Sequence, residues 1–236
     1  LSGWDKRVKL TIDQNDVDSD LTDFPVLIYL STSSGRGSDD VSFVFDELQS
    51  DANRKKIAVT RSDGTTQCFV EIEKWDDASE KAWLWIKAPS VSGTVDTDLY
   101  LYYDKDHADN IVRVGDTDST PAENVWDTNH KGVWHLDEAT GGSGAMKDST
   151  SNNNDGTDSG SPTLGTAGIT GNAVDFDGTD DYLNHSDSSS LDVSGTGLTI
   201  SAWVAPDFLP TTVNSPQIVN KMGTTINAYR LFFRYD

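Results

Sequence analysis

Several features are scarce in this chain of 236 residues, and each scarcity excludes a class of protein. The chain has one cysteine, Cys68, so no disulfide can form within it. Cys68 lies in the run 67–72 (QCFVEI) without the sequence context of a thiol enzyme, so we expect a buried small hydrophobic side chain. No apolar run approaches the ~20 residues that cross a bilayer, so we expect no membrane insertion.

Basic residues are also scarce. The chain has 18 Lys and Arg against 39 Asp and Glu, which gives a net charge of −21. This balance argues against nucleic acid as a partner, because binding phosphates requires basic patches. Asp makes up 33 of the 39 acidic residues, and residues 148–220 contain ten Asp and no Lys or Arg. Asp favours turns, caps and oxygen-ligand cation sites, although a solvated surface suited to a salty medium explains such acidity equally simply.

Helical signals are nearly absent, and strand signals recur along the chain. Short apolar or alternating runs are separated by Gly, Asp and Ser, which is typical of all-β proteins. The Asp63-Gly64 pair predicts a tight hairpin turn. We interpret residues 1–105 as a first antiparallel sandwich. Its expected strands are 24–30, 41–45, 57–60, 68–72, 82–86 and 99–103.

The polar stretch 106–124 predicts a connection, in which 107–114 forms a short helix or an irregular segment. The strand pattern restarts at Val125, so we expect a second domain over residues 125–236. The Gly-, Ser- and Asn-rich stretch 139–170 is interpreted as ordered surface loops rather than a disordered linker. The fold class predicted is therefore all-β, with two consecutive antiparallel β-sandwich domains of jelly-roll type.

The segment 171–183, GNAVDFDGTDDYL, predicts a strand, a tight Asp-Gly turn and a second strand. Four carboxylates crowd these residues, at Asp175, Asp177, Asp180 and Asp181. Carboxylates in a turn either cap backbone N–H groups or hold a hard cation such as Ca²⁺. The sequence leaves these two roles open.

Five ordered pieces of the second domain resemble a laminin-G-like domain of the concanavalin A-like lectin/glucanase superfamily. The pieces are residues 132–136 (GVWHL), 148–150 (DST), 152–156 (NNNDG), 171–183 and 198–204 (LTISAWV). The resemblance covers residues 130–236 and implies a jelly-roll sandwich with a structural calcium. It implies Asp148 as the preferred ligand. The other candidate calcium ligands are the Gly171 carbonyl, Asp175, Asp177 and Asp180. The resemblance ends early, which implies that a continuation or another chain supplies further strands.

The first domain resembles an uncharacterised family, domain of unknown function 2341. The matching pieces are residues 4–12, 21–30, 39–45, 70–75, 82–87 and 99–104. This resemblance implies a place beside laminin-G-like domains in large secreted or surface proteins, so we expect an extracellular, cell-surface or virion-surface location.

Glycan recognition would use aromatic faces, and three Trp are the candidates: Trp75, Trp83 and Trp85. Trp83 and Trp85 are two residues apart and share one face of a strand. Trp75 is flanked by charged residues, which favours an exposed position. We expect Trp203 to be partly buried. Each Trp taken singly is better explained as part of a core, which aromatic side chains fill efficiently.

A glycosidase needs two carboxylates across the scissile bond, and Glu71 and Glu73 are the one pair with suitable spacing. A solvated strand face explains this pair better than catalysis does. The four histidines form no metal-binding or Ser-His-Asp pattern, and His135 is expected to pack on the sheet. We therefore predict no enzymatic activity.

The sequence as a whole predicts a non-catalytic adhesion or carbohydrate-binding module, stabilised by calcium, that binds a glycan or surface polymer. One alternative is a structural subunit of a surface filament, envelope layer or viral fibre. Such a subunit would self-assemble or exchange strands through its sheet edges. A fragment of a polysaccharide-active enzyme is the weaker alternative.

Overall fold

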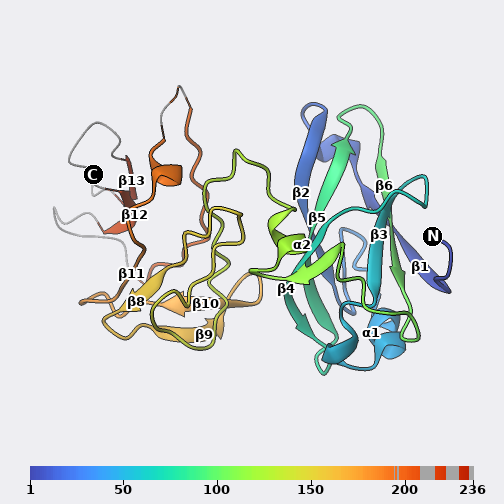
Figure 1. The fold of residues 1–236 in the computed structure, drawn as a ribbon, viewed down its shortest axis with the longest axis horizontal. Coiled ribbons are helices and arrows are strands. Elements are labelled where there is room, and N and C mark those ends of the chain that lie inside the picture. The colour runs from blue at the N-terminus through green and yellow to red at the C-terminus, as the bar shows by residue number, and fades with distance from the viewer. Residues whose placement is uncertain (194, 196, 208–215, 222–228, 234–236) are drawn as a thin grey trace. The chain divides into compact units, whose positions relative to one another are not determined.

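The structure is a computed structural model, and it describes residues 1–193, 195, 197–207, 216–221 and 229–233. The chain divides into two compact units, Leu1–Ser186 and Asp187–Asp236. The described residues are mostly β, with a few short helices and five sheets of two to four strands (Figure 1). No helix among them is long and apolar enough to span a membrane.

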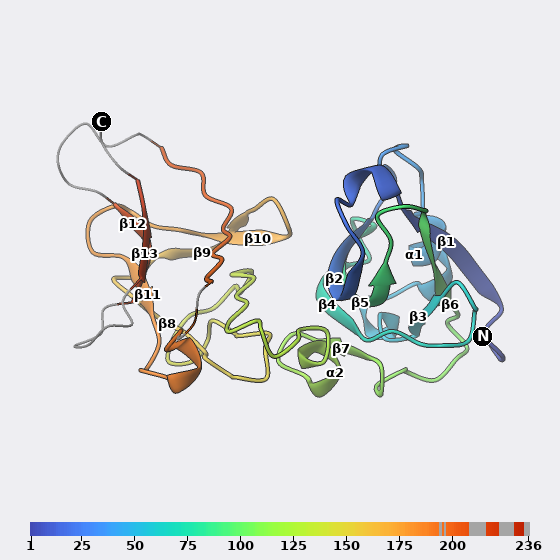
Figure 2. The ribbon, with the colours of Figure 1, turned by 90° about the horizontal axis from the view of Figure 1, so that it is seen from above.

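Two sheets of the first unit face each other across one core (Figures 1 and 2). The larger has the order β2-β5-β4-β7, in which β7 runs parallel to β4 and the other neighbours are antiparallel. Its strands are β2 (Leu21–Leu30), β4 (Val70–Asp76), β5 (Lys81–Val91) and β7 (Val114–Asp116). The smaller sheet is antiparallel, with the order β1-β6-β3. Its strands are β1 (Lys6–Ile12), β3 (Ile57–Arg61) and β6 (Thr97–Tyr103).

Alternating side chains explain why these segments are strands. In β5, Ala82, Leu84, Ile86 and Ala88 are fully buried in the core, while the residues between them face outward. Each fully buried Leu or Ile contributes about 1.5–3 kcal/mol. Cys68 joins the same core, which confirms the expectation of a buried side chain, and burial raises the pKa of its thiol to about 11.

A bulge in β4 changes the face that each side chain occupies. Ile72 pairs with Leu84, but Lys74 pairs with Trp83, so Glu73 is the extra residue. Val70 and Ile72 point into the core, and after the bulge Trp75 rather than Lys74 does so. The prediction that Trp75 is exposed is therefore wrong: it is 9% exposed, and its ring packs at a tilted angle against that of Phe45, with the centroids 4.9 Å apart.

The alternation at 41–45 predicts a strand, and this prediction is wrong. The segment Phe43–Leu48 is a helix, α1, whose Val44, Phe45 and Leu48 are buried. The Asp40 carboxylate accepts a hydrogen bond from the Ser42 N–H just before the helix, and the helix ends at Gln49, whose φ is 63°. Burial at positions 41, 44, 45 and 48 has the helical period, which the shorter alternating run hides.

The stretch expected to be a connection, 106–124, contains β7 and a helical turn, α2 (Thr120–Glu123). Three 3-10 turns complete the helical elements: η1 (Gln14–Asp16), η2 (Asp51–Asn53) and η3 (Ser189–Leu191). The predicted turn at Asp63-Gly64 is present, with Gly64 at a φ of 69°.

Beyond residue 130 the first unit contains small sheets and irregular backbone. Its strands are β8 (Thr157–Ser159), β9 (Thr163–Ala167), β10 (Asn172–Asp175) and β11 (Tyr182–Asn184). The strand, turn and strand predicted for 171–183 are present, but β10 pairs with β9 and β11 pairs with β8. The expected strand at 132–136 is reduced to one bridge, between Trp134 and Asp148.

The second unit contains β12 (Gln217–Lys221), paired with β13 (Tyr229–Phe232), and η3. The segment 198–204, one of the pieces that resemble a laminin-G-like domain, has no strand or helix assignment. Trp203 is 81% exposed rather than partly buried. A strand needs a hydrogen-bonded neighbour, which its own residue pattern cannot supply. The described residues are thus mostly β, in several small sheets, and do not clearly form two jelly-roll sandwiches.

Candidate functional site

The loop between β10 and β11 brings three carboxylates together. Asp177, Asp180 and Asp181 each offer a carboxylate oxygen, and these oxygens lie within 4.8 Å of one another. Asp177 and Asp180 are exposed, and Asp181 is half-buried. We call these three residues the Asp triad. Carboxylate oxygens on a loop are the ligand chemistry that Ca²⁺ requires, so the Asp triad could hold a metal ion.

Local hydrogen bonds shape the loop. The Asp177 carboxylate accepts from the Thr179 N–H (2.8 Å), and the Asp181 Oδ2 accepts from the Asp177 N–H (2.9 Å). Gly178, at a φ of 73°, permits the turn. The Asp181 Oδ1 is buried and has no hydrogen-bond partner among the described residues. Both roles that the sequence left open are thus supported, because the same carboxylates cap the turn and leave oxygens for a cation.

One aromatic residue precedes the Asp triad in the sequence and another follows it. Phe176 is 42% exposed and Tyr182 is 54% exposed. Neither is among the aromatic residues that the sequence singled out for glycan binding. Their position next to the acidic turn was readable from the sequence, but their exposure was not.

The other predicted calcium ligands lie outside the Asp triad. Asp148 is fully buried, and its carboxylate accepts hydrogen bonds from the backbone N–H groups of Val133, Thr150 and Asn154, at 2.9 to 3.0 Å. The Thr150 hydroxyl donates to it as well. With four donors, this carboxylate acts as the cap of a turn. Asp175 is exposed on β10, and Gly171 packs next to the Lys74 side chain.

A second group of carboxylates is buried on the outer face of the larger sheet. Glu71 and Glu73 point away from the core, yet both side chains are fully buried. The expectation of a solvated strand face is therefore wrong. The segment 126–149 covers this face, since Trp126, His135 and Ser149 all contact Glu71.

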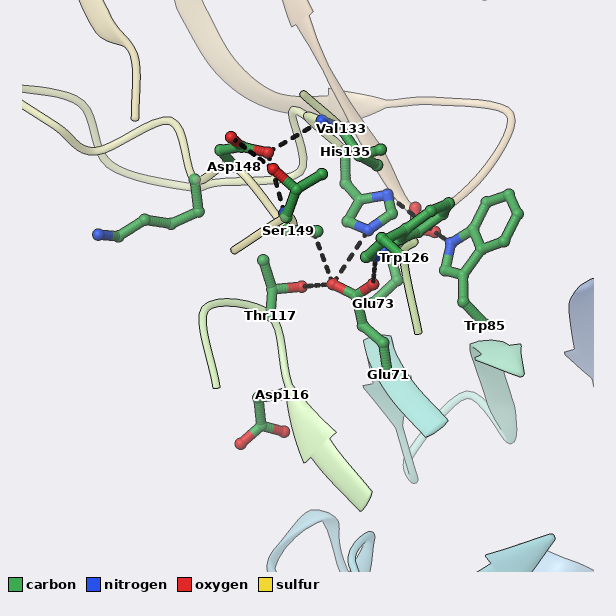
Figure 3. A network of polar contacts seen from close by, with 12 residues as sticks. Glu71, Glu73, Trp85, Asp116, Thr117, Trp126, Val133, His135, Asp148 and Ser149 are labelled. Carbon is green, nitrogen blue, oxygen red and sulfur yellow. Dashed lines mark hydrogen bonds and ion pairs between the residues drawn. The ribbon is translucent and has the colours of Figure 1, made fainter. Parts of the chain in front are cut away.

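Figure 3 shows Glu71 at the centre of this network. Its Oε1 accepts from the Ser149 hydroxyl (2.7 Å), the Thr117 hydroxyl (2.9 Å) and His135 Nε2 (3.2 Å). Its Oε2 accepts from the Trp126 indole N–H (2.7 Å). An ionised carboxylate has about four lone-pair sites, so four donors saturate Glu71.

Glu73 is less well satisfied. Its Oε2 accepts from the Trp85 indole N–H (2.6 Å) and lies 3.4 Å from His135 Nδ1, while its Oε1 has no hydrogen-bond partner among the described residues. Burial raises the pKa of Glu73, and the opposing charge of His135 offsets this only in part. We call Glu71, Glu73 and His135 the buried cluster.

His135 lies between the two carboxylates, and its side chain is 6% exposed. Burial by itself lowers the pKa of His135, but the hydrogen bond and charge of Glu71, together with the charge of Glu73, raise it above its usual value. The sequence had placed His135 on the sheet. It gave no sign of the contact with both carboxylates, because these residues are about sixty positions apart.

The three Trp named from the sequence occupy different environments. Trp75 is in the core, and Trp85 is half-buried and donates to Glu73. Trp83 is half-buried on the same outer face, with its ring centroid 4.9 Å from that of Tyr29. Of these three Trp, Trp83 is the one that is partly exposed and whose indole N–H makes no recorded hydrogen bond among the described residues.

Comparison with known proteins gives one match. Residues 53–144 match the family described as Domain of unknown function (DUF2341). This region holds β3 to β7, the helical turn α2 and His135, so it contains every member of the buried cluster. It begins and ends later than the resemblance noted for residues 1–105. No match to a laminin-G-like domain is found, and no curated protein or solved structure matches the chain.

Proposed function

We propose that this protein is a non-catalytic adhesion or carbohydrate-binding module of a secreted or surface protein, with a calcium ion held at the Asp triad. The observation that supports it best is the loop 176–182, where three carboxylates converge between two exposed aromatic side chains. A cation with free coordination positions can bind sugar hydroxyls, while an aromatic face packs against the apolar face of a sugar ring. The laminin-G-like sequence pieces point to the same class of module.

Calcium titration followed by calorimetry tests the first half of the proposal. We expect the wild-type protein to bind Ca²⁺, and the Asp177→Asn/Asp180→Asn variant to bind it at least about tenfold more weakly, because ligand charge sets calcium affinity. Asp5→Asn is the matched control, since Asp5 is exposed and lies outside the Asp triad. Equal binding by all three proteins would remove calcium from the proposal.

A glycan array with and without a chelator tests the second half. We expect binding that the chelator abolishes, and that Tyr182→Ala weakens without changing calcium affinity. If calcium binds but no glycan does, the Asp triad is a structural metal site and the recognition role is wrong.

The buried cluster does not favour the enzyme alternative. A glycosidase needs carboxylates that reach the substrate, and the side chains of Glu71 and Glu73 have no exposed surface. The saturated hydrogen bonding of Glu71 fits a structural role instead.

Assembly through sheet edges remains the alternative proposal. The observation that favours it is the number of open edges: β8 and β11 form one two-stranded sheet, and β9 and β10 another. Unpaired edge groups of this kind accept strands from other chains. Sedimentation analysis over a wide concentration range distinguishes the two, because an assembly subunit forms oligomers and a binding module stays monomeric.

A further inference from the structure

The proposed function leaves the buried cluster without a role. Both ring nitrogens of His135 face carboxylate oxygens: Nε2 lies 3.2 Å from Glu71 Oε1, and Nδ1 lies 3.4 Å from Glu73 Oε2. An ionised carboxylate can only accept hydrogen bonds, so while both carboxylates are ionised both nitrogens must carry a proton to satisfy them. The geometry therefore suits the protonated, cationic form of His135.

Loss of one proton would change this arrangement. A neutral imidazole has one bare nitrogen, which would face a carboxylate oxygen in a site from which water is excluded. Two buried negative charges would then share the site without a cation, which is costly in a low-dielectric environment. Release of the covering segment to water would relieve this cost.

The surroundings of His135 offer no replacement cation. The charged groups that act on it are Glu71 and Glu73 from β4 and Asp137 from its own segment. Lys74, also on β4, donates to Asn172 instead, at 2.6 Å. The side chains that donate to the two carboxylates from other elements are neutral: the indoles of Trp85 and Trp126 and the hydroxyls of Thr117 and Ser149. One further titratable side chain lies nearby: His130, which pairs with Asp127, has its ring centroid 5.3 Å from that of Trp126.

We propose that His135 acts as a proton-operated latch, which holds the segment 126–149 on the outer face of the larger sheet while protonated and loosens it when the proton is lost. Three residues of this segment, Trp126, His135 and Ser149, donate to the single carboxylate of Glu71. Loss of the His135 proton therefore also weakens the hydrogen bonds of Trp126 and Ser149, because all three side chains share the Glu71 carboxylate.

The direction of the pH dependence follows from the folded-state pKa values. The pKa of His135 and that of Glu73 are both raised, so the folded protein holds protons more tightly than the unfolded chain at these two groups. For His135 the stabilisation is complete below the usual histidine pKa of about 6.5 and is lost as the pH rises through the raised value. The latch is thus closed in mild acid and opens toward alkaline pH.

Nuclear magnetic resonance of the indole N–H groups tests the latch directly. The protein is labelled with ¹⁵N-tryptophan, and the signals of Trp85 and Trp126 are identified from Trp85→Phe and Trp126→Phe variants. We expect these two signals to shift together with one midpoint above about pH 6.5, because both indoles donate to the carboxylates that hold His135. If they do not titrate, or titrate with a midpoint below that value, the latch is wrong.

Stability measurements provide the matched comparison. We expect the unfolding equilibrium constant of the wild type to increase as the pH rises above about 6.5, and His135→Gln to lose this increase. His107→Gln is the control, since the contacts recorded for His107, with Trp4 and Ala108, lie outside both the buried cluster and the segment 126–149. It should keep the wild-type pH dependence. Identical profiles for all three proteins would overturn the proposal, and should His135→Gln fail to fold, the resonance titration alone decides.

Discussion

The buried cluster and the Asp triad are both groups of acidic side chains, yet they differ in almost every physical respect. Glu71 is fully buried and accepts hydrogen bonds from four side chains. Asp177 and Asp180 are exposed, and the contacts that the structure records for the loop are turn bonds from its own backbone. The first group holds elements of the fold together, and the second is open to a ligand.

This difference shows that the environment, rather than the residue type, decides what a carboxylate can do. A buried carboxylate is costly unless donors surround it, so its neighbours are arranged to supply them. An exposed carboxylate is solvated at little cost, and its oxygens are free to exchange water for a cation.

The largest effect is expected from Glu71→Ala. This substitution leaves the Trp126 indole, the two hydroxyls and His135 without their acceptor in a buried site. We expect the free energy of unfolding to fall by about 3–5 kcal/mol, measured by urea denaturation. Glu80→Ala, on the β4–β5 turn, should change the free energy of unfolding little. Equal losses in both variants would mean that the hydrogen bonds of the buried cluster do not contribute to stability.

A smaller loss is expected from Trp126→Phe, which removes one donor and keeps most of the apolar ring. A hydrogen bond to a charged group contributes about 1.5–3 kcal/mol, and we expect a loss of that order. Trp203→Phe serves as the control because Trp203 is 81% exposed. If Trp126→Phe is as stable as the wild type, the indole does not anchor the segment.

Glu73→Gln should have a smaller and pH-dependent effect. Burial raises the pKa of Glu73, so its charged form is disfavoured in the folded protein and its contribution to stability declines as the pH rises through that pKa. The neutral amide has no such decline. We therefore expect the variant to lose less stability near neutral pH than in acid, which denaturation at several pH values measures. A loss that grows toward neutral pH would contradict this account.

The smallest effect on stability is expected from Asp177→Asn/Asp180→Asn without calcium. Exposed side chains away from buried contacts rarely matter, so the melting temperature should stay within about 2 °C of the wild type. With calcium present, only the wild type should gain stability, since binding to the folded state alone raises the melting temperature. A large loss without calcium would mean that these carboxylates mainly hold the turn.

The sequence predicted the first sheets well because their strands follow simple alternation, as in β5 and β6. It failed at β4, where a bulge moves Trp75 into the core and leaves Glu71 and Glu73 on the covered face. It also failed at Trp203, which it placed in a partly buried position and which is 81% exposed. The Asp triad was largely predicted, since its members are neighbours in sequence. The sequence did not predict that Asp148 lies outside the Asp triad.

The sequence by itself determined the β-rich class, the burial of Cys68, the acidic surface and the turn that gathers Asp177 and Asp180. These properties depend on composition or on residues close together in the chain. Only the tertiary structure decided that Glu71, Glu73 and His135 form one buried cluster. A hydrogen bond across some sixty residues exists only after the sheet has formed and the segment 126–149 has folded over it, so no local pattern records it.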